Sequence, residues 1–259
     1  MVSELRSAIF DNIKTIVYAL LIAGAFRTLF FETFYIPSGS MKDNLLIGDF
    51  LYVNKMAYGY SRHSCPFSLC PIEGRLLFRE PERGDVVVFK HPVSGVDFIK
   101  RVVGLPGDRI QLRDGVLILN GEPVPQRDGG VFTETYERQG GQGRFPRCTN
   151  DTVSEGGDCQ KTRQIVTLPN GVEHSVLDID MGFSDNTEVM TVPAGSYFFL
   201  GDNRDNSRDS RWPQTAGGVG MVPAENLIGR AGRVVFSSAG RSLFFIWTWR
   251  QDRFFHEIS

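Results

Sequence analysis

The chain has 259 residues, of which 41% are hydrophobic and 22% are charged. These fractions are ordinary for a globular protein and exclude a disordered chain, a fibrous chain and a protein that crosses a membrane many times. The 28 basic and 30 acidic residues leave a formal net charge of −2, so no basic excess favours general binding to nucleic acid.

The first predicted element is an apolar helix near the N-terminus. Residues 15–26 are uncharged and mainly apolar. Continuing this run to Phe34 gives a helix of about 30 Å, the thickness of the hydrocarbon core of a bilayer. The continuation contains Arg27 and Glu32, and Arg27 lies in its second half, where a guanidinium can reach the membrane interface.

Hydropathy alone leaves two interpretations of this segment open. One is a membrane anchor, and the other is a signal peptide that is cleaved after Ala23-Gly24-Ala25. Arg6 and Lys14 precede the apolar run and mildly favour an N-terminus in the cytoplasm.

The segment Pro37–Met41, with the sequence PSGSM, follows the apolar run directly. Proline fixes φ and glycine permits a tight backbone, so Ser40 can be held on a shaped loop. Alone the pattern is weak, because most Ser-Gly-Ser segments are simply turns.

The rest of the chain is typical of β-strands joined by tight turns. Apolar and β-branched runs predict strands within 48–55, 83–92, 97–105, 190–203 and 227–237, and a hairpin over 108–124 that turns at Asp114-Gly115. Helical periodicity is convincing only near the N-terminus. We therefore predict a mainly β fold, in which an N-terminal transmembrane helix precedes an antiparallel β-sheet domain with a smaller β-rich excursion. The aromatic tail LFFIWTWRQDRFF fits either a core strand or a membrane contact.

Lys100 lies in the middle of the predicted strand 97–105. Side chains alternate between the two faces of a strand, so Lys100 shares a face with Phe98 and Val102, while Arg101 lies on the other. An ammonium group among apolar neighbours loses hydration and its pKa falls, which allows a lysine to act as a general base. The alternative is an edge-strand lysine that reaches solvent.

The cysteines do not have the spacing of a C-x-x-C redox or zinc motif. They are Cys65, Cys70, Cys148 and Cys159. The second pair lies in the polar, glycine-rich segment 126–163, which we predict to be an excursion from the core. In an oxidising compartment both pairs are candidates for disulfides, with free thiols as the alternative. A metal site of His63, Cys65 and Cys70 is a minor alternative, and we predict no metal site.

The segment Gly201–Arg211, GDNRDNSRDSR, is denser in Asp, Asn and Ser than a turn requires. It is not a calcium loop, because the sixth position from Asp202 is not glycine and the twelfth is Pro213 rather than glutamate. It is either a solvated loop or a polar network that holds another group in place.

Together, these segments resemble bacterial signal peptidase I, the membrane-anchored leader peptidase. The matching segments are PSGSMKDNLLIGDFLYVNK, RGDVVVFKHP with DFIKRVVGLPGD, and GDNRDNSRDSR, which follow the family's order and spacing and cover about a quarter of the chain. The departures are modest: Lys42-Asp43-Asn44 replaces a stretch that is often apolar, and Arg208 occupies a variable position.

The resemblance implies an uncleaved, single-pass signal anchor in the bacterial inner (cell) membrane, with the catalytic domain on the periplasmic, extracytoplasmic side. The expected organisation is a cytoplasmic N-terminus at 1–13, an anchor at 14–34 and a peptidase domain at 35–259, with a loop-rich β subdomain around 111–190.

The resemblance also implies roles for individual residues. Ser40 is the expected nucleophile and Lys100 the expected general base, while the Ser38 side chain and the Ser40 N–H are the expected oxyanion donors. The expected supporting residues are Met41, Ser207, Asp209 and Arg211. Among them, Ser207 is expected to hydrogen-bond the lysine. The expected lining of the pockets for small substrate residues is Phe34, Ile36, Phe98 and Ile99.

The implied activity is serine endopeptidase cleavage that removes signal peptides from secreted preproteins through an acyl-enzyme. No histidine lies in a motif, which disfavours a Ser-His-Asp triad, and a Ser-Lys pair is a workable variant. This chemistry needs no cofactor. The expected partners are preproteins and the lipid bilayer, without nucleic acid, and we expect a monomer.

Two alternatives have less support. One is a related Ser-Lys peptidase, such as a self-cleaving repressor or a pilin-processing enzyme, although a repressor needs a DNA-binding motif where this chain has its apolar segment. The other is a membrane-anchored β-rich binding or scaffold protein.

Overall fold

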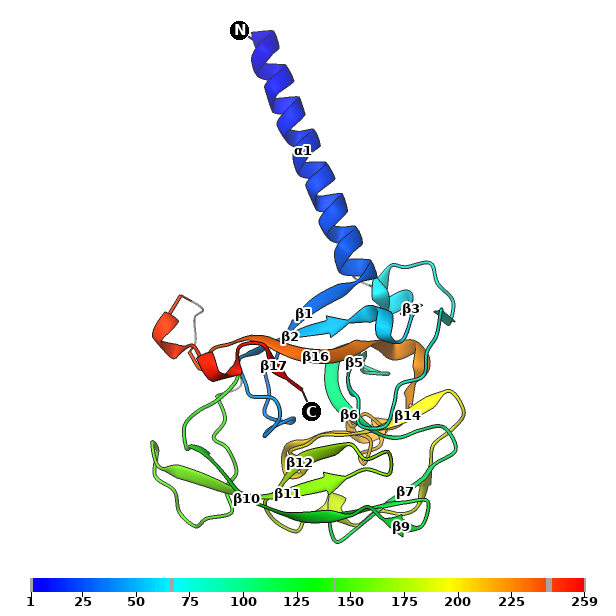
Figure 1. The fold of residues 1–259 in the computed structure, drawn as a ribbon, viewed down its shortest axis with the longest axis vertical. Coiled ribbons are helices and arrows are strands. Elements are labelled where there is room, and N and C mark those ends of the chain that lie inside the picture. Colours follow the sequence, from blue (N-terminus) through cyan, green and yellow to red (C-terminus); the bar gives the residue numbers. More distant parts are fainter. Residues whose placement is uncertain (1, 66–67, 142, 241–243, 259) are drawn as a thin grey trace.

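The computed structural model describes residues 2–65, 68–141, 143–240 and 244–258. A long N-terminal helix projects from one end of a β-rich body (Figure 1). The strands pair antiparallel in the described part of the chain, as the sequence predicts.

Helix α1 spans Val2–Leu29 and is the predicted apolar helix. Its part Ile9–Leu29 is long and apolar enough to cross a membrane, by length and composition. Its apolar side chains do not pack on the β-rich body; Leu20, for example, is 67% exposed. An apolar helix without a partner inside the protein suits a bilayer rather than water.

The helix ends at Leu29, before the predicted end of the anchor at residue 34, because the next residues form strand β1, Phe31–Tyr35. Aromatic residues there pair with strand β2. Glu32 accepts hydrogen bonds from the Arg27 guanidinium and from Lys55 Nζ, the latter at 2.9 Å. Lys55 Nζ also donates to the carbonyl of Arg27 at 3.3 Å, and Tyr60 Oη donates to the carbonyl of Leu29 at 2.7 Å. The carbonyls at the helix end, which lack partners within the helix, are thus bonded to the β-rich body.

The largest sheet has the strand order β1-β2-β16-β5-β6-β14-β15, and β17 also pairs with β16. Its remaining strands are β2 Asp49–Asn54, β5 Val86–Lys90, β6 Asp97–Gly104, β14 Ser196–Leu200, β15 Val222–Pro223, β16 Leu227–Ser237 and β17 His256–Glu257. The runs of β-branched and aromatic residues predicted as strands form its centre.

Smaller sheets have the orders β13-β7-β8-β9, β10-β11-β12 and β3-β4. Their strands are β3 Tyr60–Ser61, β4 Arg75–Leu76, β7 Arg109–Arg113, β8 Val116–Leu119, β9 Glu122–Pro123, β10 Gln126–Thr135, β11 Asp158–Thr167, β12 Glu173–Asp178 and β13 Met190–Thr191. The predicted hairpin turn lies between β7 and β8, where Asp114 and Gly115 both have positive φ, as a two-residue type I′ turn requires.

Short 3₁₀ helices punctuate the connections. Those described are Lys55–Ala57, Arg62–Ser64, Phe183–Asp185, Arg204–Asn206, Gln214–Ala216, Ala224–Asn226, Ile246–Thr248 and Gln251–Arg253.

Strand β5 is buried on both faces, which explains its continuous apolar sequence. Val86 and Val88 pack into one core cluster, and Val87 and Phe89 pack into another. Each such side chain contributes about 1.5–3 kcal/mol when it is fully buried. The central strands therefore provide a rigid base for whatever side chains β6 carries.

The aromatic tail does not form a core strand in its described part, so that alternative is wrong. It contains the 3₁₀ helices at 246–248 and 251–253, and Phe244 is 90% exposed. The tail is attached by Arg253 Nη2, which donates to Asp49 Oδ2 at 2.6 Å. Within the tail, Trp249 forms a single antiparallel bridge with Ser238, and the rings of Trp249 and Phe254 contact Phe236 of β16.

Candidate active site

Ser40 lies in the loop that connects β1 to β2. Ile36 before it and Met41 after it are buried in the same core cluster, with 2% and 0% of their surfaces exposed. The Ile36 backbone closes the loop, because its N–H donates to the Asp49 carbonyl at 2.9 Å and its carbonyl accepts from Gly48 N at 3.0 Å. The two apolar residues thus hold the Ser40 backbone in one position.

Lys100 projects from β6 toward Ser40. Lys100 Nζ donates to Ser40 Oγ at 2.6 Å and to the Ile99 carbonyl at 2.8 Å. Lys100 is only 3% exposed and Ser40 only 7%. Burial lowers the pKa of Lys100 to about 8, against the opposing effect of the carboxylates of Asp209 and Asp202. With this pKa, roughly a tenth of the lysine is neutral at pH 7, and the neutral amine can accept a proton.

The neighbouring Arg101 is also buried, but on the other face of β6, where it binds Asp202. Arg101 Nε and Nη2 donate to the two carboxylate oxygens at 2.9 and 2.8 Å, and Nη1 donates to the Gly84 carbonyl at 2.8 Å. Burial alone raises the pKa of Asp202, and the charge and hydrogen bonds of Arg101 outweigh it and lower the pKa. This pair joins β6 to the segment that follows β14.

That segment is the Asn- and Asp-rich motif 201–211, and it holds the Ser40 loop. Asn203 N donates to the Ser40 carbonyl at 3.1 Å, and Asn203 Nδ2 donates to the Gly39 carbonyl at 2.9 Å. The sequence gives Asn203 no individual role; the density of amide and carboxylate side chains is the signal that marks it. Of the two interpretations of this motif, the polar network describes it and the solvated loop does not.

Gly201 allows the two segments to approach closely. A Cβ atom at this position would lie 2.6 Å from the Ser40 carbonyl oxygen and would overlap the side chain of Ser207. Any larger residue would therefore push the two segments apart.

Asp209 and Arg211 form a buried ion pair behind Ser207. Arg211 Nε donates to Asp209 Oδ1 at 2.9 Å, and Asp209 Oδ2 accepts from the Gly201 N–H at 3.0 Å. Burial raises the pKa of Asp209, and Arg211 more than offsets this effect and lowers it. The pair fixes the backbone on which Ser207 lies.

Ser207 does not make the expected hydrogen bond to Lys100. Its Oγ is buried and has no hydrogen-bond partner of ordinary geometry among the described residues, although its hydroxyl helps to lower the pKa of Asp209. The physical reason is that Lys100 Nζ is directed toward Ser40 Oγ and the Ile99 carbonyl instead.

Ser38 directly precedes Gly39 in the Ser40 loop, and its Oγ lies 3.5 Å from Ser40 Oγ. Phe34 and Ile99 pack on the cluster that contains Ile36, so these three expected pocket residues lie together. Phe98 packs on a different cluster, and its ring centroid is 5.5 Å from Lys100 Nζ.

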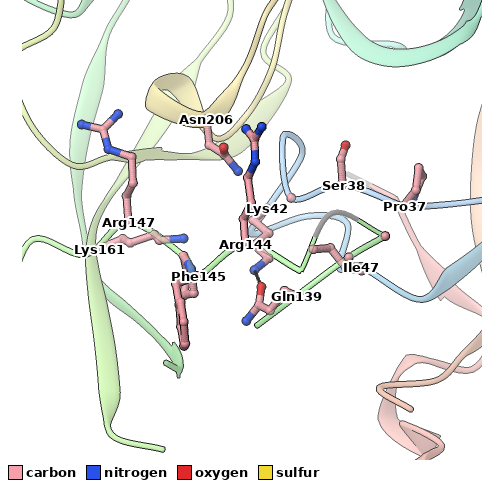
Figure 2. A pocket seen from close by; sticks show the side chains of 14 residues that line it. Pro37, Ser38, Lys42, Ile47, Gln139, Arg144, Phe145, Arg147, Lys161 and Asn206 are labelled. Carbon is pink, nitrogen blue, oxygen red and sulfur yellow. Dashed lines mark hydrogen bonds between the residues drawn. The ribbon is translucent and has the colours of Figure 1, made fainter. Parts of the chain in front are cut away.

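A pocket of about 420 Å³ opens beside Ser38 (Figure 2). One wall is the Ser40 loop, and the other is the excursion loop that connects β10 to β11. The lining residues are Pro37, Ser38, Gly39, Lys42, Ile47, Gln139, Gly140, Gly141, Arg144, Phe145, Pro146, Arg147, Lys161 and Asn206.

Buried charges join the excursion to the Ser40 loop. Lys42 forms an ion pair with Glu134 and donates to Gln139 Oε1 at 2.6 Å, and Lys161 also binds Glu134. Lys42 belongs to the stretch that departs from the family pattern, so the sequence does not indicate this contact. The excursion is therefore docked on the loop rather than detached from it.

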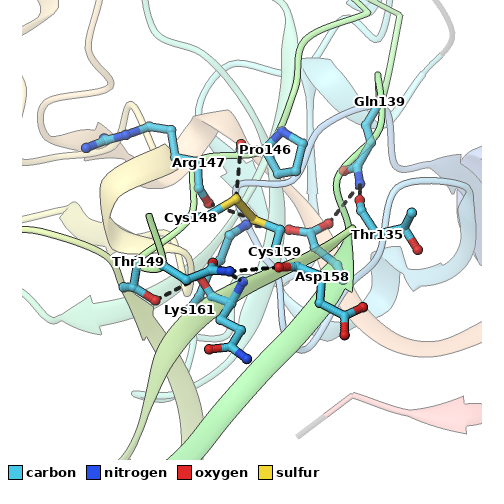
Figure 3. The surroundings of a disulfide bond; sticks show 12 residues. Thr135, Gln139, Pro146, Arg147, Cys148, Thr149, Asp158, Cys159 and Lys161 are labelled. Atoms are coloured by element: carbon cyan, nitrogen blue, oxygen red, sulfur yellow. Dashed lines mark hydrogen bonds and ion pairs between the residues drawn. A yellow bond between two sulfur atoms is a disulfide. The ribbon is translucent and has the colours of Figure 1, made fainter. Parts of the chain in front are cut away.

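Cys148 and Cys159 are joined by a disulfide that ties the excursion loop to β11 (Figure 3). Next to it, Arg147 Nη1 donates to the Asp205 carbonyl at 3.1 Å. The loop is thus held to its own hairpin and to the 201–211 motif.

Cys65 and Cys70 are also joined by a disulfide. The free-thiol alternative is therefore wrong for both pairs, and no thiolate remains at Cys65 and Cys70 for the metal site with His63.

Comparisons with known proteins agree on one family. The family model described as "Signal peptidase, peptidase S26" matches residues 9–236. Signal peptidase I of Rickettsia akari (strain Hartford) is 38% identical over 231 residues, which are 85% of this chain and 77% of that protein. Signal peptidase I of Rickettsia typhi (strain ATCC VR-144 / Wilmington) is 37% identical over 248 residues, 88% of this chain and 84% of that protein.

A crystal structure of a signal peptidase I from Enterococcus faecalis V583 is also similar. Its sequence identity is 26%, the match covers 59% of this chain and 97% of that chain, and the TM-score is 0.31.

Proposed function

This chain belongs to the signal peptidase family, peptidase S26, and is a serine endopeptidase, and we propose that it removes signal peptides from secreted preproteins with Ser40 as nucleophile and Lys100 as general base. The observation that carries this assignment is the 2.6 Å hydrogen bond between Lys100 Nζ and Ser40 Oγ in a buried site. A serine hydroxyl needs an adjacent base to become a good nucleophile, and a lysine of lowered pKa can be that base.

In the first step, neutral Lys100 accepts the Ser40 proton as Oγ attacks the carbonyl at the end of the signal peptide. Burial makes the neutral amine available, with a pKa of about 8, and the carboxylates of Asp209 and Asp202 limit how far it falls. The charged ammonium then donates a proton to the departing amine of the mature protein.

The oxygen of the tetrahedral intermediate carries a negative charge and needs donors. We assign this role to the Ser40 N–H and the Ser38 hydroxyl, whose Oγ is 3.5 Å from Ser40 Oγ. Donors directed at an oxygen whose charge develops in the transition state raise the chemical rate more than they raise substrate affinity.

In the second step, water attacks the acyl-enzyme and Lys100 accepts its proton. The Lys100 ammonium then returns this proton to Ser40 Oγ as the ester bond breaks, which releases the signal peptide with a free carboxyl group and restores both residues. The role that we propose for Asn203, Asp209 and Arg211 is to position the Ser40 loop and the backbone around Lys100, through the hydrogen bonds described above. Neither step requires a cofactor.

We propose that Phe34, Ile36 and Ile99 form the surface that selects small residues before the cleaved bond. They are apolar neighbours of the Ser40 loop and pack on one cluster. We place Phe98 at the same site because its ring lies next to Lys100 Nζ.

We propose that α1 anchors the enzyme in the bacterial inner membrane, with residues 1–13 in the cytoplasm and the peptidase domain, 35–259, on the periplasmic side. The apolar part of α1 supports the anchor. The two disulfides support an oxidising compartment for the domain. We also propose that the enzyme acts as a monomer, because Ser38, Ser40 and Lys100 come from one chain.

The decisive experiment is cleavage of a labelled preprotein by the full-length chain in detergent. We expect the mature protein and the free signal peptide as products, and no product with the folded Ser40→Ala variant. A scaffold protein would cleave nothing, and a self-cleaving repressor would cleave only its own chain. Either result would overturn the proposal.

A further inference from the structure

The pocket beside Ser38 is strongly basic. Lys42, Lys161, Arg144 and Arg147 line it, and no described aspartate or glutamate does. The nearby Glu134 binds both lysines, so it neutralises only one of their two charges. This concentration of positive charge stands out in a chain whose formal net charge is −2.

The two arginines are available to an incoming group. Both side chains are exposed, and among the described residues neither has a carboxylate partner. Arg147 binds only the Asp205 backbone carbonyl, which leaves its charge uncompensated. Figure 2 shows Arg147 and Arg144 from the excursion, with Asn206 beside them and Ser38 at the other end of the pocket.

Close contacts hold the wall of the pocket in place. Gly140 of the excursion contacts the Ser40 loop so closely that a Cβ atom there would lie 2.8 Å from the Pro37 carbonyl oxygen. The Cys148–Cys159 disulfide and the Lys42–Glu134 ion pair hold the same wall. Basic groups on a fixed wall can distinguish ligands by the position of a charge.

The position of the pocket indicates which part of a substrate enters it. A peptide whose carbonyl lies at Ser40 extends in two directions from that point. In the binding mode proposed above, the apolar cluster with Phe34, Ile36 and Ile99 receives the residues before the cleaved bond, and it shares no residue with the lining of the basic pocket. The basic pocket therefore lies along the other direction, which the residues after the cleaved bond follow.

We propose that this pocket is a subsite for an acidic side chain in the first three residues of the mature protein, and that Arg144 and Arg147 are its specificity-determining residues. This inference rests on the proposed function. A carboxylate in the pocket offsets the excess positive charge, whereas a lysine side chain is repelled. Because both arginines are exposed, water and salt screen the attraction and the preference is modest.

The test compares preproteins that differ in one residue. Glutamate, glutamine or lysine is placed at the first, second or third position after the cleavage site, and kcat/KM is measured for the full-length chain in a neutral detergent. At the most sensitive position we expect glutamate to exceed glutamine by about three- to fivefold, with lysine slower still, and the ratio to fall as salt is added.

Variants assign the effect to the two arginines. In Arg144→Gln/Arg147→Gln we expect the Glu-to-Gln ratio to approach one, and in Arg144→Glu/Arg147→Glu we expect it to fall below one. The matched control is Arg127→Gln, an exposed arginine on the same hairpin that pairs with Glu173 outside the pocket and should leave the ratio unchanged. The ratio is internal to each variant, so partial loss of folded protein does not alter it.

The outcomes separate the two proposals. Equal cleavage of all substrates by the wild-type chain, or a glutamate preference that persists without both arginines, would overturn the acidic subsite and leave the peptidase assignment intact. Stimulation by anionic vesicles that depends on the arginines, with no substrate preference, would assign the pocket to lipid headgroups and also overturn it. If the folded wild-type chain cleaved none of the preproteins, the proposed function itself would fail.

Discussion

Gly201 lies against the Ser40 carbonyl, in a space that admits no side chain: a Cβ atom on Gly201 would come within 2.6 Å of that oxygen. The same carbonyl accepts a hydrogen bond from Asn203 N at 3.1 Å. The backbone of the nucleophile loop is therefore positioned by the absence of a methyl group as well as by hydrogen bonds.

Gly201→Ala is expected to move the Ser40 loop and to lower kcat by about 100-fold, because small misplacements of reacting groups are costly. The change in KM should be smaller, since Gly201 does not belong to the apolar cluster that we propose as the substrate surface. Steady-state kinetics on the folded variant measures both. Gly232→Ala is the control, because a Cβ atom there has no neighbour within 4 Å. A kcat for Gly201→Ala within about twofold of wild type would contradict this account.

The pH profile should show the titration of Lys100. Only the neutral amine accepts a proton, so log kcat/KM should rise with a slope of about one as pH increases and should level off above the pKa of about 8. Lys100→Ala and Lys100→Arg should both be inactive, because arginine does not deprotonate in proteins. His174 cannot produce this limb, because burial, with the charge of Arg101, lowers its pKa to about 3. An activity that is constant from about pH 6 to 9 would exclude the lysine base.

Ser38→Ala should lower kcat by roughly 10²–10³, with little change in KM, if its hydroxyl stabilises the oxyanion. Ser38→Thr keeps the hydroxyl and should recover much of the rate. If Ser38 only stabilises the turn, the alanine variant will have a lower thermal midpoint and nearly normal turnover per folded molecule. Measuring kcat and thermal midpoints for both variants separates the two roles.

The Arg101–Asp202 ion pair should contribute strongly to stability, because both side chains are almost completely buried, with 0% and 1% exposed. Asp202→Asn removes one charge and leaves the other unpaired, so the free energy of unfolding should fall by about 3–5 kcal/mol. Urea denaturation of the full-length chain measures this change. Glu173→Gln, which breaks the exposed pair with Arg127, should cost less than about 1 kcal/mol and serves as the control.

The Arg101–Asp202 ion pair should also make the free energy of unfolding depend on pH. The pKa of Asp202 is lowered in the folded chain, so its contribution is complete above the pKa of an unfolded aspartate and is lost as pH falls through the lower folded value. Asp202→Asn should therefore show a smaller loss of stability on acidification than the wild type. Equal acid sensitivity of the two proteins would contradict the depressed pKa.

The disulfide of the excursion can be tested separately. A Cys148→Ala/Cys159→Ala variant frees the loop from β11, and we expect destabilisation of about 2–3 kcal/mol from the model of chain entropy. Hydrogen exchange should increase at residues 136–157, while kcat on a substrate without acidic residues near the cleavage site should change only a few-fold. Unchanged exchange at these residues would contradict this prediction and would mean that the remaining contacts, such as the Arg147 hydrogen bond to the Asp205 carbonyl, are enough to hold the loop.

Much of the fold follows from local pattern. The strand β16 and the β7–β8 turn lie where the sequence predicts them, because an apolar β-branched run and an Asp-Gly pair are local signals. The position where α1 ends does not follow from local pattern. Phe31–Tyr35 has the apolar character of the helix before it, and its pairing with β2 determines its structure. A single-sequence pattern cannot supply that distant partner.

The candidate site divides in the same way. Ser40 and Lys100 stand out because a short serine loop and a lysine within an apolar strand are visible along the chain, although they are brought together only by the fold. The sequence does not predict the roles of Asn203 and Lys42, because each acts through a contact with a distant segment. The resemblance predicts the place of Ser207 but not its hydrogen bonding, which depends on the direction of Lys100 Nζ, and Nζ donates to Ser40 Oγ instead.

The hydrogen bonds from Lys55 and Tyr60 to the last carbonyls of α1 have a mechanical consequence. They bind the end of the helix to the domain, so we expect the helix and the domain to move together. If α1 spans the bilayer, its tilt adjusts to the thickness of the surrounding lipid, and that tilt is transmitted to Ser40. The height of the nucleophile above the lipid surface then depends on the membrane itself, and a membrane of a different thickness presents the same preprotein to the enzyme at a different level.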